Sequence, residues 1–292
     1  MTHILTLVGN REEAALTSAV IGLAQDAVEG KAARVLSPGE AVAIPCSPAP
    51  DITRVRAALA GTVVDVIVTP AQGQRKRLLI ADMDSTIIQG ETLDDLAAQA
   101  GLGETISVIT ARAMNGELDF KAALRERVAM LRGLPASLLD KTWAGVRLTP
   151  GARQLVATMR AHGAYTALVS GGFTFFTSRV AALVGFDLHR SNTLLIRDGR
   201  LTGHVAEPIL DRAAKLETLR ELMKKQGLTA GEALATGDGA NDLDMIGAAG
   251  LGVAFHAKPI VAAAAGARVD HADLRALLFA QGYPASAFVG AD

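Results

Sequence analysis

Two aspartates separated by one residue end an apolar stretch in the first third of the chain. Residues 78–86 read Leu-Leu-Ile-Ala-Asp-Met-Asp-Ser-Thr, so Asp82 and Asp84 directly follow the apolar run. Such a run closed by short polar side chains is typical of a buried strand in a parallel sheet. Open α/β sheets bind ligands beyond the carboxyl ends of their strands. An isolated Asp-x-Asp pair is more simply explained as a turn or as a helix cap at Ser85 or Thr86, so other parts of the chain must decide.

A second pair of aspartates follows another apolar stretch. Asp238 and Asp242 come after a strand that we expect over residues 232–236. In a parallel sheet the carboxyl ends of neighbouring strands open into one crevice, which brings these carboxylates towards Asp82 and Asp84. Carboxylates gathered in one place repel each other unless a cation lies among them. A hard divalent ion with oxygen ligands, Mg²⁺, suits this composition better than zinc.

A third expected strand, over residues 164–169, ends in Ser170, Gly171 and Gly172. A hydroxyl and exposed amide N–H groups ahead of a helix can bind a phosphate, and Lys215 in the first turn of a later helix can supply a further positive charge. Carboxylates, a divalent cation, this anion-binding segment and one lysine together indicate phosphoryl transfer. Each signal alone could be a cap or a turn, but their joint placement at successive strand ends favours the chemical interpretation.

The elements that must position these residues alternate between strand and helix. This order predicts an α/β fold with a doubly wound, parallel, Rossmann-like sheet. Residues 90–148 instead carry four helical patterns and few strand signals, which predicts a helical cap inserted after the first strand of the core. Asp198-Gly199 lies between two short apolar runs and predicts a hairpin. The catalytic domain is expected to span residues 78–292.

Residues 1–70 predict a separate, small α+β domain with the element order β-α-β-β-α-β. This order resembles the ACT-type fold of amino-acid-sensing regulatory domains. A structural or dimerising unit fits the same pattern, and a homodimer is one arrangement that it allows. Residues 71–77 then predict a linker, in which the basic triplet 75–77 is expected to be a solvated face. The expected strands are 3–8, 33–36, 41–44 and 63–68, and the expected helices are 12–27 and 51–60.

The overall composition limits the classes of partner. The 29 Lys and Arg residues nearly balance the 30 Asp and Glu residues, so no general field attracts nucleic acid or an anionic membrane. The single cysteine, Cys46, cannot form an internal disulfide, and no Cys and His cluster has metal-site spacing. No signal-peptide pattern and no run of about 18 apolar residues is present. We therefore expect a cytoplasmic protein with a small-molecule substrate and no nucleic-acid or membrane partner.

The motifs at the strand ends resemble the four ordered motifs of the haloacid dehalogenase superfamily of phosphatases. The resemblance covers about residues 75–292, and the spacing between its first two motifs leaves room for the helical cap of that superfamily. Within it, Glu91 and the segment 114–128 resemble the phosphoserine phosphatase family. This resemblance implies Mg²⁺-dependent hydrolysis of O-phospho-L-serine to L-serine and phosphate through an aspartyl-phosphate, the last step of serine biosynthesis. The matching motifs are 82–86, Ser170, Lys215 and 237–242.

The resemblance also implies a role for each matching residue of the core. Asp82 would be the nucleophile, and Asp84 the general acid that protonates the leaving serine oxygen and then activates water. Asp82, the main-chain carbonyl of Asp84, and Asp238 would ligate Mg²⁺, with Asp242 supporting them. The phosphoryl oxygens would be held by Ser170, Gly171, Gly172, Lys215 and Asn241.

The cap residues would select the substrate. Phosphoserine carries an ammonium and a carboxylate beside its phosphate, and Glu91 and Arg127 would bind these two groups. Met114 and Phe120 would close the pocket and exclude water. The alternative explanation for Arg127 is an ion pair on the helix surface. Only the family resemblance favours Arg127 over Arg125 as the substrate-binding residue. For the whole chain, a phosphotransferase and a serine-binding regulatory protein with an inactive phosphatase half remain the alternatives.

Overall fold

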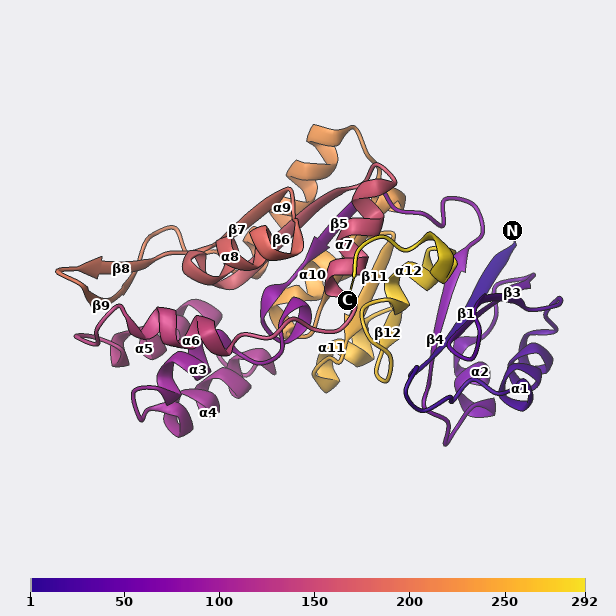
Figure 1. Cartoon of the computed structure of the whole chain (residues 1–292), viewed down its shortest axis with the longest axis horizontal. Helices are drawn as coiled ribbons and strands as arrows, with labels where there is room; N and C mark the ends of the chain where they lie inside the picture. The colour runs from indigo at the N-terminus through magenta and orange to yellow at the C-terminus, as the bar shows by residue number, and fades with distance from the viewer. Residues whose placement is uncertain (1, 292) are drawn as a thin grey trace.

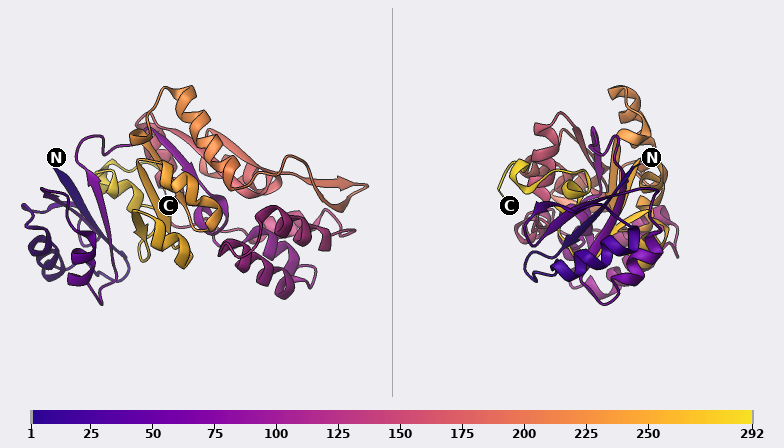
Figure 2. Two further views of the ribbon diagram at one scale, coloured as in Figure 1. Left: turned by 180° about the vertical axis from the view of Figure 1, so that it is seen from behind. Right: turned by 90° about the vertical axis from the view of Figure 1, so that its right-hand side faces the viewer.

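The computed structural model describes residues 2–291, which form an elongated molecule with three regions along its length (Figures 1 and 2). A four-stranded region built from the N-terminus lies at one end, and a six-stranded core lies in the middle. The helical cap and a two-stranded hairpin lie at the other end. No helix within residues 2–291 is long and apolar enough to cross a membrane.

The N-terminal region has the predicted β-α-β-β-α-β order and an antiparallel sheet in the order β2-β3-β1-β4. One prediction is wrong: the first helix begins at Ser18 rather than at residue 12. The side chain of Asn10 accepts a hydrogen bond from the backbone N–H of Glu12 and starts a separate turn, and Thr17 caps the helix. The elements are β1 (His3–Gly9), α1 (Ser18–Val28), β2 (Arg34–Ser37), β3 (Ala41–Cys46), α2 (Ile52–Ala58) and β4 (Val64–Pro70).

The core sheet is parallel throughout, in the order β12-β11-β10-β5-β6-β7. This arrangement confirms the predicted doubly wound α/β core. Its strands are β5 (Leu78–Ala81), β6 (Tyr165–Phe173), β7 (Leu188–Asn192), β10 (Ala233–Gly237), β11 (Leu251–Phe255) and β12 (Ala267–Val269). Its helices are α7 (Ala152–Ala161), α8 (Thr174–Val184), α9 (Arg212–Gln226), α10 (Leu243–Ala248), α11 (Pro259–Ala264) and α12 (Ala276–Ala280).

Strand β5 shows why helices cover both faces of this sheet. Leu78 and Ile80 are fully buried in a cluster with side chains of α9 and α10, whereas Leu79 and Ala81 are buried in a second cluster with side chains of α7 and α8. Successive side chains of a strand point to opposite faces. An unbroken apolar run therefore needs cover on both sides, which is the physical basis of the α/β prediction.

The cap consists of α3 (Thr92–Ala98), α4 (Gly103–Met114), α5 (Phe120–Met130) and α6 (Leu138–Gly145). A predicted hairpin, β8 (Leu194–Arg197) and β9 (Arg200–Val205), projects from the core and lies beside α5 (Figure 1). The backbone N–H of Gly133 donates to the carbonyl of Leu201, and the backbone N–H of Leu201 donates to the carbonyl of Leu134. The cap therefore contacts the hairpin as well as the strand ends of the core.

The basic triplet before β5 is only partly the solvated face that the sequence predicts, because Arg75 and Arg77 are exposed whereas Lys76 is buried. Lys76 is only 5% exposed, and its ammonium donates to the carbonyls of Gly73 and Gly231. The guanidinium of Arg75 lies 4.4 Å from the ring centre of Tyr283. Only the charge of Lys76 is therefore taken from water to backbone carbonyls, and Arg75 stacks on an aromatic ring while it stays exposed.

The N-terminal sheet is covered on one face by α1 and α2, while its other face packs against α12 of the core. Asp65 on β4 anchors this contact, because its buried carboxylate accepts hydrogen bonds from three consecutive backbone N–H groups, those of Asp270, His271 and Ala272. The N-terminal region therefore covers one end of the core.

Replacing Asp65 by alanine should destabilise the protein by about 2–4 kcal/mol, because three backbone N–H groups, one of them buried, would lose their acceptor. Asp65→Asn keeps one acceptor oxygen and should lose about half as much. Urea unfolding of the full chain measures both values. A free energy of unfolding for Asp65→Ala within about 0.5 kcal/mol of the wild type would contradict this account of the contact.

Candidate active site

The first catalytic candidate, Asp82, lies directly beyond β5, where its backbone N–H donates to the carbonyl of Thr236 on β10. The fully buried ammonium of Lys215 lies 2.7 Å from a carboxylate oxygen of Asp82 and 2.7 Å from one of Asp242. Burial by itself lowers the pKa of Lys215, but the two carboxylates outweigh it and raise that pKa. Lys215 is therefore a permanent positive charge behind Asp82.

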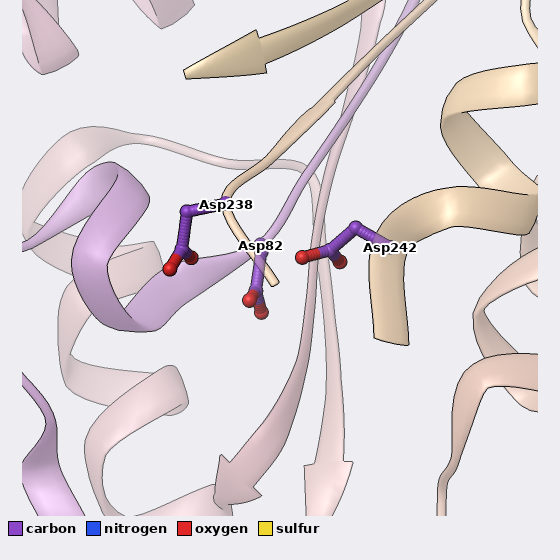
Figure 3. A group of neighbouring side chains, drawn as sticks. All are labelled: Asp82, Asp238 and Asp242. Carbon is purple, nitrogen blue, oxygen red and sulfur yellow. The ribbon is translucent and has the colours of Figure 1, made fainter. Parts of the chain in front are cut away.

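Three buried aspartates, Asp82, Asp238 and Asp242, have carboxylate oxygens within 4.8 Å of one another (Figure 3). Burial, together with the neighbouring carboxylates, raises the pKa of Asp238 well above its usual value and that of Asp242 to about 7. Thr86 donates to one oxygen of Asp238, whereas the other oxygen is buried and has no hydrogen-bond partner within residues 2–291. An unpaired carboxylate oxygen in an acidic cluster fits a hard divalent cation.

The carboxylate of Asp84 lies apart from that cluster. One of its oxygens accepts a hydrogen bond from the backbone N–H of Thr92 at 2.8 Å, and the other accepts one from the hydroxyl of Ser170 at 3.3 Å. Burial, with the nearby charge of Asp82, raises the pKa of Asp84 to about 6. A carboxyl group with this pKa can hold a proton near neutral pH and release it again, as a general acid and base must.

The segment Ser170 to Gly172 differs from the sequence expectation in its backbone. Strand β6 runs on to Phe173, beyond the predicted end at residue 169, so these residues are part of the strand, and the next helix begins directly after it at Thr174. Both positions require glycine, because a larger residue would collide with neighbouring side chains. A Cβ at residue 171 would lie 2.6 Å from the ring of Phe120, and a Cβ at residue 172 would lie 2.7 Å from a carboxylate oxygen of Asp84. The glycines thus let the cap and Asp84 approach the strand end.

Arg127 is only 3% exposed, so its interpretation as a helix-surface ion pair is wrong. Its guanidinium donates to the carbonyl of Ala123 and to the hydroxyl of Thr110. Burial lowers the pKa of Arg127, although the charges of Asp94, Glu91 and Asp84 oppose that shift. Arg125 instead forms an exposed ion pair with Glu207.

Glu91 faces the same space from the start of α3, where it accepts a hydrogen bond of 2.7 Å from the hydroxyl of Ser85. Burial and the charges of Asp84 and Asp238 raise its pKa well above the usual value. A cationic group placed beside Glu91 would relieve this repulsion. A ligand with an ammonium group fits this position.

Several groups that support the site were not found from the sequence. Thr110 joins Arg127 to Asp94, because the Thr110 hydroxyl accepts from the guanidinium and donates to the carboxylate. Thr86, which lies in the matching motif 82–86 but had no role assigned, donates to Asp238, and the backbone N–H of Thr92 donates to Asp84. Threonines of this kind are common in helices and turns, so no spacing in the sequence singles them out.

The predicted residues surround one narrow cavity of about 30 Å³, room for about two water molecules. This space is too small for a substrate with a phosphate group, so we expect the cap to move away from the core to admit it. Lys215 and Asp242 do not line the cavity and lie behind Asp82. The predicted residues that line it are Asp82, Asp84, Glu91, Met114, Phe120, Arg127, Ser170, Gly171, Gly172, Asp238 and Asn241.

Residues 79–247 match the haloacid dehalogenase-like hydrolase family. The chain is 46% identical over 226 residues to a phosphoserine phosphatase of Streptomyces coelicolor, a match that covers 77% of this chain and 55% of that protein. This chain therefore spans about half the length of such curated relatives.

Two solved structures are also similar. A haloacid dehalogenase family hydrolase, t0658 from Salmonella enterica serovar Typhi, is 30% identical with a TM-score of 0.82, and the alignment covers 95% of this chain and 98% of that one. A phospho-aspartyl intermediate analogue of phosphoserine phosphatase is 38% identical with a TM-score of 0.68, over 70% of this chain and 98% of that one. The first similarity includes the N-terminal region, because it extends over nearly the whole chain.

Proposed function

Because this chain belongs to the haloacid dehalogenase-like hydrolases, we propose that it is a phosphoserine phosphatase that hydrolyses O-phospho-L-serine to L-serine and phosphate. One observation carries this proposal: the cavity that Asp82 lines is also lined by a buried arginine, Arg127, and a partly buried glutamate, Glu91. A phosphate, a carboxylate and an ammonium group on one small molecule match these three positions.

In the first step, a carboxylate oxygen of Asp82 attacks phosphorus, and the bond between phosphorus and the serine oxygen breaks. Asp84 gives its proton to that oxygen, because an alkoxide is a poor leaving group. In the second step Asp84 takes a proton from water, which attacks the aspartyl-phosphate and restores Asp82. The hydrogen bonds that Thr92 and Ser170 donate hold Asp84 in place for both transfers.

Positive charge and hydrogen-bond donors must hold the phosphoryl oxygens. Ser170, Gly171 and Asn241 line the cavity and would supply these donors, and Lys215 lies behind Asp82. Asp82, Asp238 and the main-chain carbonyl of Asp84 would hold Mg²⁺, with Asp242 supporting them. When bound, the ion supplies the positive charge that draws the phosphate to these carboxylates.

Phosphate release from L-phosphoserine and from a panel of small phosphomonoesters, each with and without Mg²⁺, tests the proposal. We expect phosphoserine to be the preferred substrate and chelation of the metal to abolish turnover. Release of free phosphate without an added alcohol separates a hydrolase from a phosphotransferase, since the latter needs an acceptor. Absence of phosphoserine turnover in the presence of Mg²⁺ would refute the proposed function.

Arg127→Ala should lower kcat/KM for phosphoserine by about 100-fold, because a buried charged hydrogen-bond donor to the substrate carboxylate is lost. Turnover of an aryl phosphate, which has no carboxylate, should change by less than about threefold. Arg125→Ala serves as the matched control, since Arg125 lies on the same helix but in an exposed ion pair. An equal loss on both substrates would contradict the assigned role of Arg127.

A further inference from the structure

The small volume of the cavity implies that the cap opens to admit a substrate, and the contacts between cap and core show which interactions must then break. The hinge is the place where the chain enters and leaves the cap. There, Ile88 and Leu148 form a β-bridge, and the backbone N–H of Gln89 donates to the carbonyl of Arg147. These bonds join the strands that enter and leave the cap, so they can persist when it moves. The interactions that hold the closed form must lie away from this hinge.

Besides the backbone hydrogen bonds between the cap and the hairpin β8–β9, three ion pairs within residues 2–291 join the cap to the core away from the hinge. One of them has both a short distance and a partly buried acceptor: the ammonium of Lys121 on α5 lies 2.7 Å from the carboxylate of Asp211, which is 22% exposed. The pair of Arg125 and Glu207 is equally short but more exposed, and the pair of Arg179 and Asp140 is longer, at 3.9 Å.

The Lys121–Asp211 pair joins the two helices that carry opposite halves of the site. Phe120, the residue before Lys121, places its ring against Gly171, and the same helix carries Arg127. Asp211 caps α9 by accepting a hydrogen bond from the backbone N–H of Ala214, one residue before Lys215. The pair thus fixes the first turn of α5 against the first turn of α9.

We propose that Lys121 is a positioning residue whose ion pair with Asp211 holds the cap in its closed, substrate-binding form. The proposal rests on the proposed function in one respect, namely that phosphoserine is bound by cap and core together. Exposed ion pairs of this kind change an equilibrium constant by a factor of about 1.5 to 5. Lys121→Met should therefore raise KM for phosphoserine by about two- to fivefold.

The variants are chosen to separate the ion pair from general stability. Lys121→Arg keeps the charge and should retain the wild-type KM. Arg160→Met is the matched control, because the Arg160–Asp187 pair lies wholly within the core. Its distance is 2.8 Å, and its side chains are 47% and 21% exposed, compared with 42% and 22% for Lys121 and Asp211. Raising the salt concentration should raise KM of the wild type by a larger factor than KM of Lys121→Met, because the variant has lost the screened pair.

Asp211→Asn completes the test, because asparagine caps a helix as well as aspartate does. If the two side chains act as a pair, Asp211→Asn should raise KM as Lys121→Met does, and the double variant should equal either single one. A wild-type KM for Lys121→Met, an equal rise in Arg160→Met, or full additivity in the double variant would overturn the proposal.

Hydrogen exchange of the free protein keeps this test independent of the substrate. The amides of residues 170–174, which the cap covers, should exchange about two- to fivefold faster in Lys121→Met than in the wild type, and at the wild-type rate in Lys121→Arg and Arg160→Met. If phosphoserine is not a substrate, the proposed function fails while this exchange result still decides the role of Lys121. Unchanged exchange in Lys121→Met would refute it.

Discussion

Asp82→Asn should abolish phosphoserine turnover, with kcat falling by a factor on the order of 10⁵. The amide nitrogen that replaces one carboxylate oxygen carries no nucleophilic lone pair, and the remaining oxygen is a weak nucleophile. Lys215 lies 2.7 Å from Asp82 in the wild type, so the variant also loses one partner of a buried charge. Both effects act on the step that forms the aspartyl-phosphate.

Acid quenching of the enzyme with radiolabelled phosphoserine tests this step directly. The wild-type protein should retain a label that hydroxylamine removes, as expected for an acyl phosphate, and Asp82→Asn should retain none. Asp198→Asn is a suitable control, because this exposed turn residue has a φ of +51°, which asparagine tolerates equally well. More than about 1% of wild-type turnover in Asp82→Asn, or a label on it, would remove Asp82 from the mechanism.

The fold could be predicted where burial leaves a pattern in the sequence. Strands β5, β6, β10 and β11 are apolar because helices cover both their faces, and their order is enough to indicate a parallel sheet. Strand β7 was missed, because Leu188–Asn192 reads Leu-His-Arg-Ser-Asn and lies at an edge of the sheet with its side chains partly exposed. An edge strand needs no apolar run, so periodicity cannot reveal it.

The catalytic candidates could be predicted because each follows a strand, and the topology then brings the strand ends together. The surroundings that set the pKa values of these residues could not be predicted. The hydrogen bond from Thr92 to Asp84 depends on how the cap chain leaves β5, and the burial of Arg127 depends on Thr110 one helix away. Such contacts are set by packing between segments, which leaves no local signal.

Asp84→Asn should lower kcat for phosphoserine by about 10²- to 10⁴-fold, because asparagine can neither donate a proton to the serine oxygen nor accept one from water. The amide oxygen can still accept the hydrogen bond from the backbone N–H of Thr92, so the loop should keep its position. Formation of the aspartyl-phosphate from an aryl phosphate should fall much less, because a phenolate leaves without a proton.

The pH dependence of this variant gives the sharper result. Burial raises the pKa of Asp84 to about 6, so the protonated fraction falls from about 90% at pH 5 to about 10% at pH 7. Single-turnover formation of the aspartyl-phosphate from phosphoserine should therefore slow about tenfold per pH unit above 6 in the wild type. Asp84→Asn should lack this decline, since its amide does not titrate. If the decline persists in the variant, the proton comes from another group, and Glu91, whose pKa is also raised by burial, is the next carboxyl to test.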